Sequence, residues 1–165
     1  MSAIADFRLI ETSKLSDLKA HAEVQIKKTL FSKKTIDNYW SYLDANSTKL
    51  KDFPWSGHIF SSLLIFLEEK KGIGLLRGSH DAIADSISEL RQSGTFILTI
   101  DHESKHLKDL SPDKFNLEEL IEFNVEFSEE DDPELATAEL AGIQALHESL
   151  ELLTDDKSVV LLSIG

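Results

Sequence analysis

The spacing of apolar side chains predicts that much of the chain is helical. In five stretches, apolar residues recur every three or four positions with polar residues between them, which is typical of amphipathic helices. These predicted helices cover residues 14–30, 35–45, 57–70, 80–93 and 133–153. In the second of them we expect Trp40 to be a core residue, because it shares a helical face with Ile36 and Leu43.

Three other stretches have the apolar pattern of β-strands. Residues 3–10 alternate loosely, and residues 122–127 alternate strictly, between apolar and polar side chains. Residues 158–164 form an aliphatic run interrupted only by Ser163, which favours a strand buried on both faces. We therefore expect 158–164 to be central in a sheet. Residues 95–101 fit either a strand or a helix.

Local signals mark the last helix and fix the expected architecture. Asp132 can accept hydrogen bonds from the first turn, and Pro133 suits the first helical position because it has no N–H to satisfy. At 165 residues, the chain is long enough for a single domain with a substantial core. We predict a single α+β domain over residues 1–165, with a small mixed β-sheet packed against about five helices.

The net charge of −13 is distributed unevenly along the chain. Residues 1–82 contain 12 basic and 10 acidic side chains, a net of +2, whereas residues 83–165 contain 5 basic and 20 acidic, a net of −15. Such a field repels nucleic acid and anionic membrane and attracts basic partners. The alternative interpretation is that the charge only keeps the protein dispersed. The far face of the first predicted helix carries Lys14, Lys19, Lys27 and Lys28, which form a basic patch with Lys33 and Lys34. We interpret this patch as a solvated helix face, with an anion site as the alternative.

The composition excludes several kinds of chemistry. Because there are no cysteines, disulfides, thiol nucleophiles and cysteine metal sites are ruled out. We expect no membrane partner, since the longest apolar candidate, residues 59–67, is far too short to span a bilayer. The first residues lack the pattern of a signal peptide. We therefore expect a cytoplasmic protein.

A short motif gives the enzymatic hypothesis. His102, Glu103 and His106 form an HExxH string. On a helix its histidines can share a zinc ion while the glutamate acts as general base, as in zincin metalloproteases. Lys105 and Lys108 oppose metal binding there, and the third ligand would have to come from Glu126 or its acidic neighbours. The alternative is that the string is an exposed polar turn.

An acidic run gives the binding hypothesis. Between residues 118 and 132 there are eight carboxylates and no basic side chain. They are Glu118, Glu119, Glu122, Glu126, Glu129, Glu130, Asp131 and Asp132. The DxDxDG pattern of a calcium loop is absent. The run therefore predicts a docking face for a basic protein, with a simple solvated face as the alternative.

The order of segments resembles that of the YfbM-like family of small bacterial proteins. The resemblance rests on DNYWSYL at 37–43, with Trp40 and Leu43, on FSEE at 127–130, and on the terminal SVVLLSIG ending in Gly165. The chain departs from the family where a Tyr-Pro pair is usual, since residues 122–125 are Glu-Phe-Asn-Val. The resemblance implies a small α+β protein, supplies no catalytic residues, and does not include an HExxH motif.

Two functional hypotheses follow. The first is a non-enzymatic binding protein of the immunity or inhibitor type, which neutralises a basic partner such as a toxin and needs no cofactor. The second is a zinc-dependent hydrolase that uses the HExxH at residues 102–106.

Overall fold

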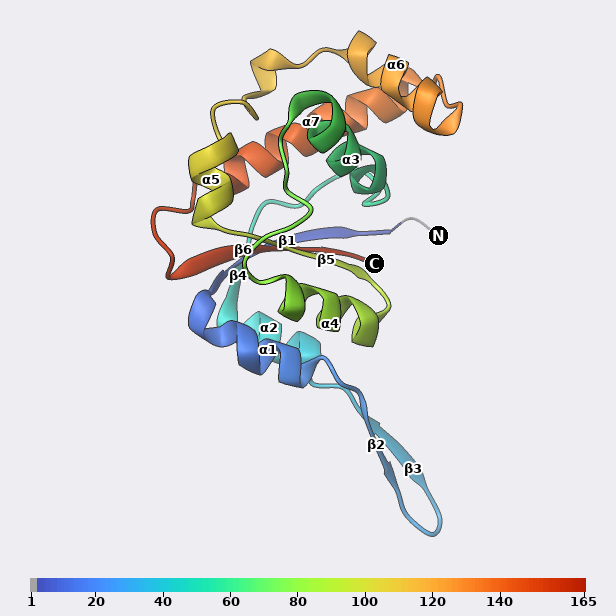
Figure 1. The fold of residues 1–165 in the computed structure, drawn as a ribbon. Coiled ribbons are helices and arrows are strands. Elements are labelled where there is room, and N and C mark those ends of the chain that lie inside the picture. Colours follow the sequence, from blue (N-terminus) through green and yellow to red (C-terminus); the bar gives the residue numbers. More distant parts are fainter. Residues whose placement is uncertain (1–2) are drawn as a thin grey trace.

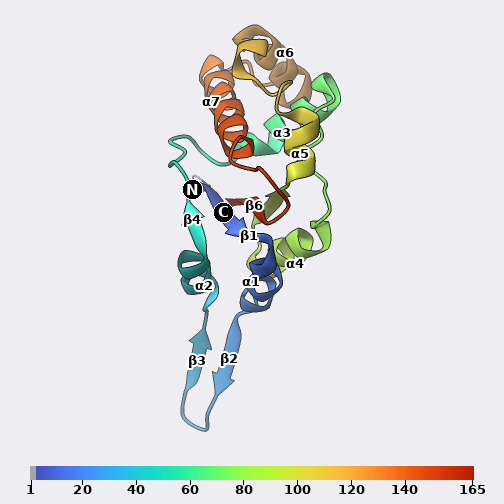
Figure 2. The same ribbon diagram turned by 90° about the vertical axis from the view of Figure 1, so that its left-hand side faces the viewer.

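Helices cover both faces of a small antiparallel sheet in the computed structural model, which describes residues 3–165 (Figures 1 and 2). The sheet has the order β4-β1-β6-β5 and comprises β1 (Ala5–Glu11), β4 (Ser47–Lys49), β5 (Gly94–Leu98) and β6 (Ser158–Ile164). A separate hairpin pairs β2 (Gln25–Lys28) with β3 (Lys33–Ile36). The helices are α1 (Leu15–His21), α2 (Tyr39–Asn46), α3 (Ile59–Lys71), α4 (Asp81–Arg91), α5 (Ile100–His106), α6 (Leu117–Ser128) and α7 (Pro133–Leu150).

The α+β class is confirmed, with two differences in detail. Every strand pairing is antiparallel, so the sheet is not mixed. Seven α-helices, rather than about five, lie within the described residues. None of these seven combines the length and apolar character that a membrane-spanning helix requires.

The C-terminal strand β6 is central, as predicted. It pairs with β1 on one side, where Arg8 lies opposite Leu161, and with β5 on the other, where Ile97 lies opposite the same leucine. Its side chains alternate between two cores: Val160 and Leu162 face one, and Val159 and Leu161 the other. Because both faces are buried, both sets must be apolar, which explains the aliphatic run.

Each face of the sheet carries its own layer of helices (Figure 1). The larger core packs α3, α6 and α7 against one face and includes Phe60, Phe123 and Leu146. The smaller core packs α1, α2 and α4 against the other face and includes Leu18 and Leu43. The two ends of the molecule therefore belong to different layers, α6 to the first and the β2–β3 hairpin to the second.

Two predicted elements are wrong because a local pattern was assigned the wrong period. The predicted helix 14–30 stops at His21, and residues 25–36 form the hairpin instead. The predicted strand 122–127 lies within α6: Phe123 is buried with Leu120 one turn earlier, whereas Val125 and Phe127 are 45 % and 50 % exposed. The alternation of EFNVEF is therefore compatible with a helix, which has a capping box at Asn116 and Glu119.

The residues at which α2 and α5 begin decide two further predictions. Helix α2 starts at Tyr39, so Tyr39 and Leu43 face the core and Trp40 is 49 % exposed. The expectation of a buried Trp40 is therefore wrong. The ambiguous stretch 95–101 contains both structures, since β5 ends at Leu98 and α5 begins at Ile100 after Thr99 as N-cap.

Helix α7 has the predicted start and contains a buried carboxyl group. Asp132 accepts a hydrogen bond from the Glu134 N–H at 2.8 Å, and Pro133 is the first helical residue. Glu139 is fully buried. Its carboxyl group accepts hydrogen bonds from Ser62 of α3 and Asn124 of α6, both at 2.7 Å. Three helices are thus joined through one side chain, and burial raises its pKa.

The close approach of the α3 start to β1 requires a glycine at position 57. A Cβ placed on Gly57 would lie 2.9 Å from both the Ala5 nitrogen and the Ile4 carbonyl carbon. We predict that Gly57→Ala lowers the free energy of unfolding by about 1–3 kcal/mol, as overpacking does, measured by urea denaturation. Gly74→Ala is the matched control, because its Cβ would meet nothing within 4 Å. Equal stability of the two variants would contradict the requirement for a glycine at position 57.

The buried carboxyl group of Glu139 predicts a pH dependence of stability. Its folded pKa is raised above the ordinary value of 4.5, so the folded state keeps the proton to higher pH than the unfolded state. The free energy of unfolding therefore falls as pH rises from 4.5 to the folded pKa. Each unit of the shift corresponds to about 1.4 kcal/mol. Glu139→Gln does not ionise: its amide oxygen can accept one of the two hydrogen bonds, and its NH2 group can donate to the Asn124 Oδ1 once that amide turns over. We expect it to be the more stable protein at neutral pH.

Urea denaturation across a pH series measures this effect, with the exposed Glu134→Gln as the matched control. A fall in stability above pH 4.5 that persists unchanged in Glu139→Gln would show that another group causes it.

Candidate functional site

The eight predicted carboxylates lie on the surface along α6 and in the segment that joins α6 to α7. This acidic surface consists of Glu118, Glu119, Glu122, Glu126, Glu129, Glu130, Asp131 and Asp132. All are exposed except Glu119, which is half-buried. The buried side of the same helix, with Leu120 and Phe123, holds α6 on the larger core. The backbone that carries these charges is therefore fixed by packing rather than by the charges themselves.

Only part of the acidic surface is neutralised within the described residues. Lys71 of α3 pairs with Glu119, and Lys70 pairs with Glu126 at 2.9 Å. Asp132 is used as the N-cap of α7. The remaining five side chains have neither an ion pair nor a hydrogen bond between residues 3 and 165; they are Glu118, Glu122, Glu129, Glu130 and Asp131. The surface is thus left with a net negative charge exposed to solvent.

The end of α6 concentrates this charge where a helix least favours it. Its last turn has no basic residue, although the carbonyl end of a helix dipole favours cations. Glu129 occupies the left-handed C-cap position with φ of 60°, a place that usually takes glycine or asparagine. Both features cost stability locally, so the carboxylates at this end do not serve to stabilise the helix.

A hollow with an apolar floor lies beside the last four of these carboxylates. This acidic hollow has a volume of about 530 Å³ and is bounded by Glu129, Glu130, Asp131 and Asp132 together with Glu134. Its floor includes Trp55, Ile59, Leu135 and Ala138. An apolar floor inside an acidic rim suits a side chain that is apolar along its length and cationic at or near its end.

The HExxH motif lies on α5, as the zinc hypothesis requires, but His102 has a structural role there. Its Nδ1 accepts a hydrogen bond from the Thr99 N–H at 2.9 Å. The proton is therefore on Nε2, which donates to the Arg77 carbonyl oxygen at 2.8 Å. His102 is buried, and its ring packs so closely on Gly78 that a Cβ there would lie 2.7 Å from it. Both ring nitrogens are thus used by the backbone.

The other members of the motif add no metal site. His106 is half-buried, and burial together with the neighbouring His102 lowers its pKa. The carboxyl group of Glu103 accepts a hydrogen bond from Ser104 at 3.3 Å. Glu126, suggested as a third ligand, pairs with Lys70 instead. Within residues 3–165, no three His, Asp or Glu side chains are grouped closely enough to hold a metal ion.

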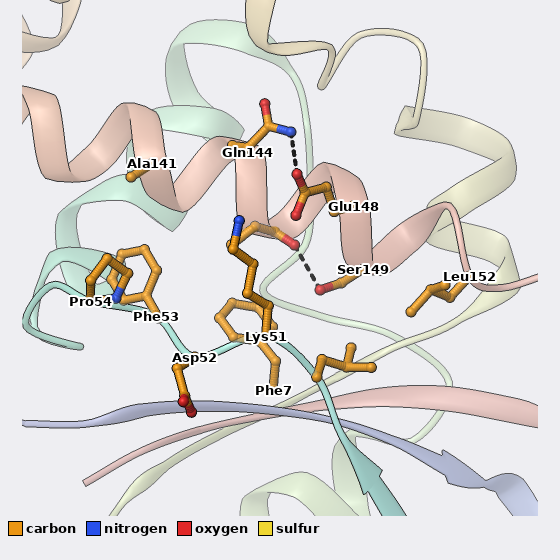
Figure 3. Close-up of a pocket in the computed structure, with 12 residues that line it drawn as sticks. Phe7, Lys51, Asp52, Phe53, Pro54, Ala141, Gln144, Glu148, Ser149 and Leu152 are labelled. Atoms are coloured by element: carbon orange, nitrogen blue, oxygen red, sulfur yellow. Dashed lines mark hydrogen bonds between the residues drawn. The ribbon is translucent and has the colours of Figure 1, made fainter.

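A second cavity, of about 590 Å³, lies between α7 and the loop that follows β4 (Figure 3). Phe7, Phe53 and Leu152 contribute apolar walls, and Lys51 and Glu148 lie at its edge. Gln144 donates to Glu148 across one turn of α7. This cavity could not be predicted from the sequence, because its walls come from three distant segments. It lacks a paired acid and base or an activated nucleophile.

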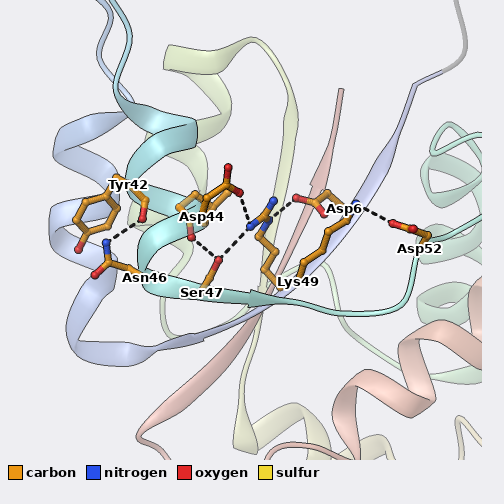
Figure 4. A network of polar contacts seen from close by, with 9 residues as sticks. Asp6, Tyr42, Asp44, Asn46, Ser47, Lys49 and Asp52 are labelled. Carbon is orange, nitrogen blue, oxygen red and sulfur yellow. Dashed lines mark hydrogen bonds and ion pairs between the residues drawn. The ribbon is translucent and has the colours of Figure 1, made fainter.

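A polar network lies at the β4 edge of the sheet (Figure 4). Arg8 pairs with Asp6 at 2.6 Å and with Asp44 at 2.8 Å, and Lys49 pairs with Asp52 at 2.7 Å. A neighbouring cavity of about 450 Å³ includes Arg91, which is itself bound to Asp37 through two hydrogen bonds. Each cation here already has an acidic partner, so the network ties β1, α2 and β4 together and leaves none of these cations unpaired.

Comparisons with known proteins provide no relative for this chain. No family model, no curated protein and no solved structure matches it. The resemblance to the YfbM-like family stays a prediction, and the functional argument rests on the residues above.

The hydrogen bonds of His102 lead to a prediction that separates a structural from a metal-binding histidine. His102→Ala leaves the Thr99 N–H and the Arg77 carbonyl group unpaired, and we expect a loss of about 1–3 kcal/mol in the free energy of unfolding. His106→Ala, the matched control, removes no side-chain hydrogen bond within the described residues and should cost less. Urea denaturation with and without a chelator measures both. A loss confined to zinc-loaded protein would contradict the structural role.

Proposed function

We propose that this protein is a non-enzymatic binding module of the immunity or inhibitor type, which holds a basic protein on its acidic surface. The observation that carries the proposal is the group of five exposed carboxylates without a partner in the described chain, three of which, Glu129, Glu130 and Asp131, line the acidic hollow. Lysine and arginine side chains of a basic protein fit such a surface chemically, because their stems are apolar and their ends are cationic.

The hollow supplies more than charge. Trp55 offers an aromatic side chain in the floor, and a cation near an aromatic face is attracted to it as well as to carboxylates. Charge alone would favour any basic protein, whereas apolar and aromatic contacts beside the carboxylates add selectivity among them. A partner that places one basic side chain in the hollow and others along α6 would use both features.

The scaffold suits tight and specific binding. Helix α6 is held by Leu120 and Phe123 in the core, and Lys70 and Lys71 fix two of its carboxylates. Its backbone and part of its side chains are therefore ordered before a partner arrives, which lowers the entropic cost of association. A basic active site covered by this end of the molecule would be blocked both sterically and electrostatically. We propose the cytoplasm as its compartment, since a chain without cysteines suits reducing conditions.

The zinc hydrolase remains the alternative hypothesis, but no observation favours it. Both nitrogens of His102 are occupied, and the described residues place no third ligand beside the motif. Binding of a basic protein requires neither free histidine nitrogens nor a third metal ligand.

A charge-reversal comparison tests the proposal. We expect Glu122→Lys, Glu129→Lys and Glu130→Lys, combined in one chain, to weaken binding of the basic partner on the order of a hundredfold, because like charges would face each other. The matched control changes Glu89, Glu151 and Asp156 to lysine; these are exposed acidic residues outside the acidic surface.

Cell extract of the source organism is passed over immobilised wild type, variant and control at low and high salt, and the retained proteins are identified by mass spectrometry. Basic proteins retained by wild type and control but lost by the variant and at high salt support the proposal. The proposal fails if no protein shows this difference.

A further inference from the structure

The β2–β3 hairpin extends away from the body of the molecule at the end opposite to α6 (Figures 1 and 2). It leaves α1 and returns to α2. Its turn is closed by the Thr29 N–H, which donates to the Ser32 carbonyl oxygen at 2.8 Å. At its base, the Asp37 carboxyl group is held by two hydrogen bonds from Arg91 of α4, at 3.0 and 2.9 Å. The arm is therefore anchored to the second helical layer.

The tip of the hairpin is apolar and almost completely exposed. Leu30 is 96 % and Phe31 98 % exposed, the highest values among the large apolar side chains that lie on the surface. Single exposed apolar residues are ordinary, but two neighbours at the apex of a projecting arm mark a contact surface. Nothing within the described chain covers them.

Four unpaired lysines surround this tip. Lys27 lies directly opposite Lys34, and Lys28 directly opposite Lys33. None of the ion pairs within residues 3–165 includes them. Like charges opposite each other weaken a strand pair, and an isolated two-stranded hairpin is marginal in water. The sequence of the arm therefore suits a complex with a negatively charged partner better than the free molecule.

The same chain carries a surface that complements this arm. Residues 25–36 have four lysines and no acidic side chain, so the rest of the chain has a net charge of −17, from −13 less +4. The acidic surface concentrates part of that charge, and the acidic hollow offers an apolar floor below a rim of carboxylates. An apolar tip ringed by lysines matches an apolar floor ringed by carboxylates.

We propose that the hairpin docks on the acidic surface of a second copy of this chain. Leu30 or Phe31 enters the acidic hollow, and the four lysines face the carboxylates around it. The inference rests on the proposed function, because it names a partner for the same acidic surface.

The positions of the two surfaces favour a closed dimer. They lie at opposite ends of one molecule (Figure 1), so the arm does not meet the acidic surface of its own chain. Two copies side by side in antiparallel orientation would satisfy both arms at once, and a two-fold pair is closed. Head-to-tail addition would instead leave one arm free at the end of every chain. Polyanions such as nucleic acid or an anionic bilayer would meet the −17 charge of the body, which repels them.

Sedimentation velocity over a concentration series measures the self-association. We expect the wild type to dimerise reversibly and to dissociate as salt is raised. Leu30→Ser combined with Phe31→Ser should weaken the dimer roughly tenfold or more, as loss of a buried apolar anchor does. A wild type that is monomeric at every concentration and salt, or a dimer unaffected by the tip change, would overturn the proposal.

A charge swap identifies the two surfaces. One variant changes Lys27, Lys28, Lys33 and Lys34 to glutamate, and a second changes Glu129, Glu130 and Asp131 to lysine. Each alone should be monomeric, whereas their mixture should form a heterodimer, because one contact is native and the other has both charges reversed. The matched control changes Lys19, Lys51, Lys105 and Lys108 to glutamate; these exposed lysines lie in no ion pair of the described chain and their variant should still dimerise.

The outcomes separate this inference from the proposed function. If the wild type stays monomeric but captures a basic protein through its acidic surface, self-docking is wrong and the binding module stands. If the charge swap restores the dimer but no other partner depends on the acidic surface, the module serves self-association alone. A mixture that stays monomeric overturns the pairing of these two surfaces.

Discussion

The burial of β6 on both faces is the constraint on which the rest of the structure depends. Because β6 lies between β1 and β5, its alternate side chains supply both cores. The helices on one face need Val160 and Leu162 to pack against, and those on the other need Val159 and Leu161. Four neighbouring aliphatic residues thus organise two layers, and a polar side chain at any of them would face a core without a partner.

This layering also separates the charges. The acidic surface belongs to the layer of α3, α6 and α7, whereas the lysine-rich arm leaves the layer of α1, α2 and α4. Within each layer the charges near the sheet are largely paired, as Arg8 with Asp6 and Asp44 shows. Two groups of charges without an ion pair in the described chain, five carboxylates of the acidic surface and four lysines of the hairpin, lie at the two far ends, where the fold does not need them. That distribution is why both ends are better explained by partners than by stability.

The sequence predicted most of the elements around the sheet and misassigned two of its patterns. Helices α3, α4 and α7 and strand β6 follow from periodicity and caps. The hairpin was missed because Ile26 and Leu30 continue the helical spacing of Leu15, Leu18 and Ala22 by coincidence. Its β-branched residues, such as Val24, Thr29 and Thr35, were the contrary signal. In α6, the capping pair Asn116 and Glu119 outweighed a period-two pattern of six residues.

The candidate sites show the same limit. The eight carboxylates lie within fifteen consecutive residues, so their grouping was visible in the sequence even though part of their helix was taken for a strand. The hollow beside it was not, because Trp55 and Ile59 come from a segment far away in the chain. His102 had the spacing of a metal ligand, yet its position in the first turn of α5 makes its nitrogen a backbone cap. A short motif names side chains, and the backbone around them decides whether their polar atoms remain free for chemistry. In this protein both nitrogens of His102 are bound to the backbone, whereas five carboxylates of the acidic surface and four lysines of the hairpin have no partner in the described chain. A function built on these unpaired groups requires no change in the fold.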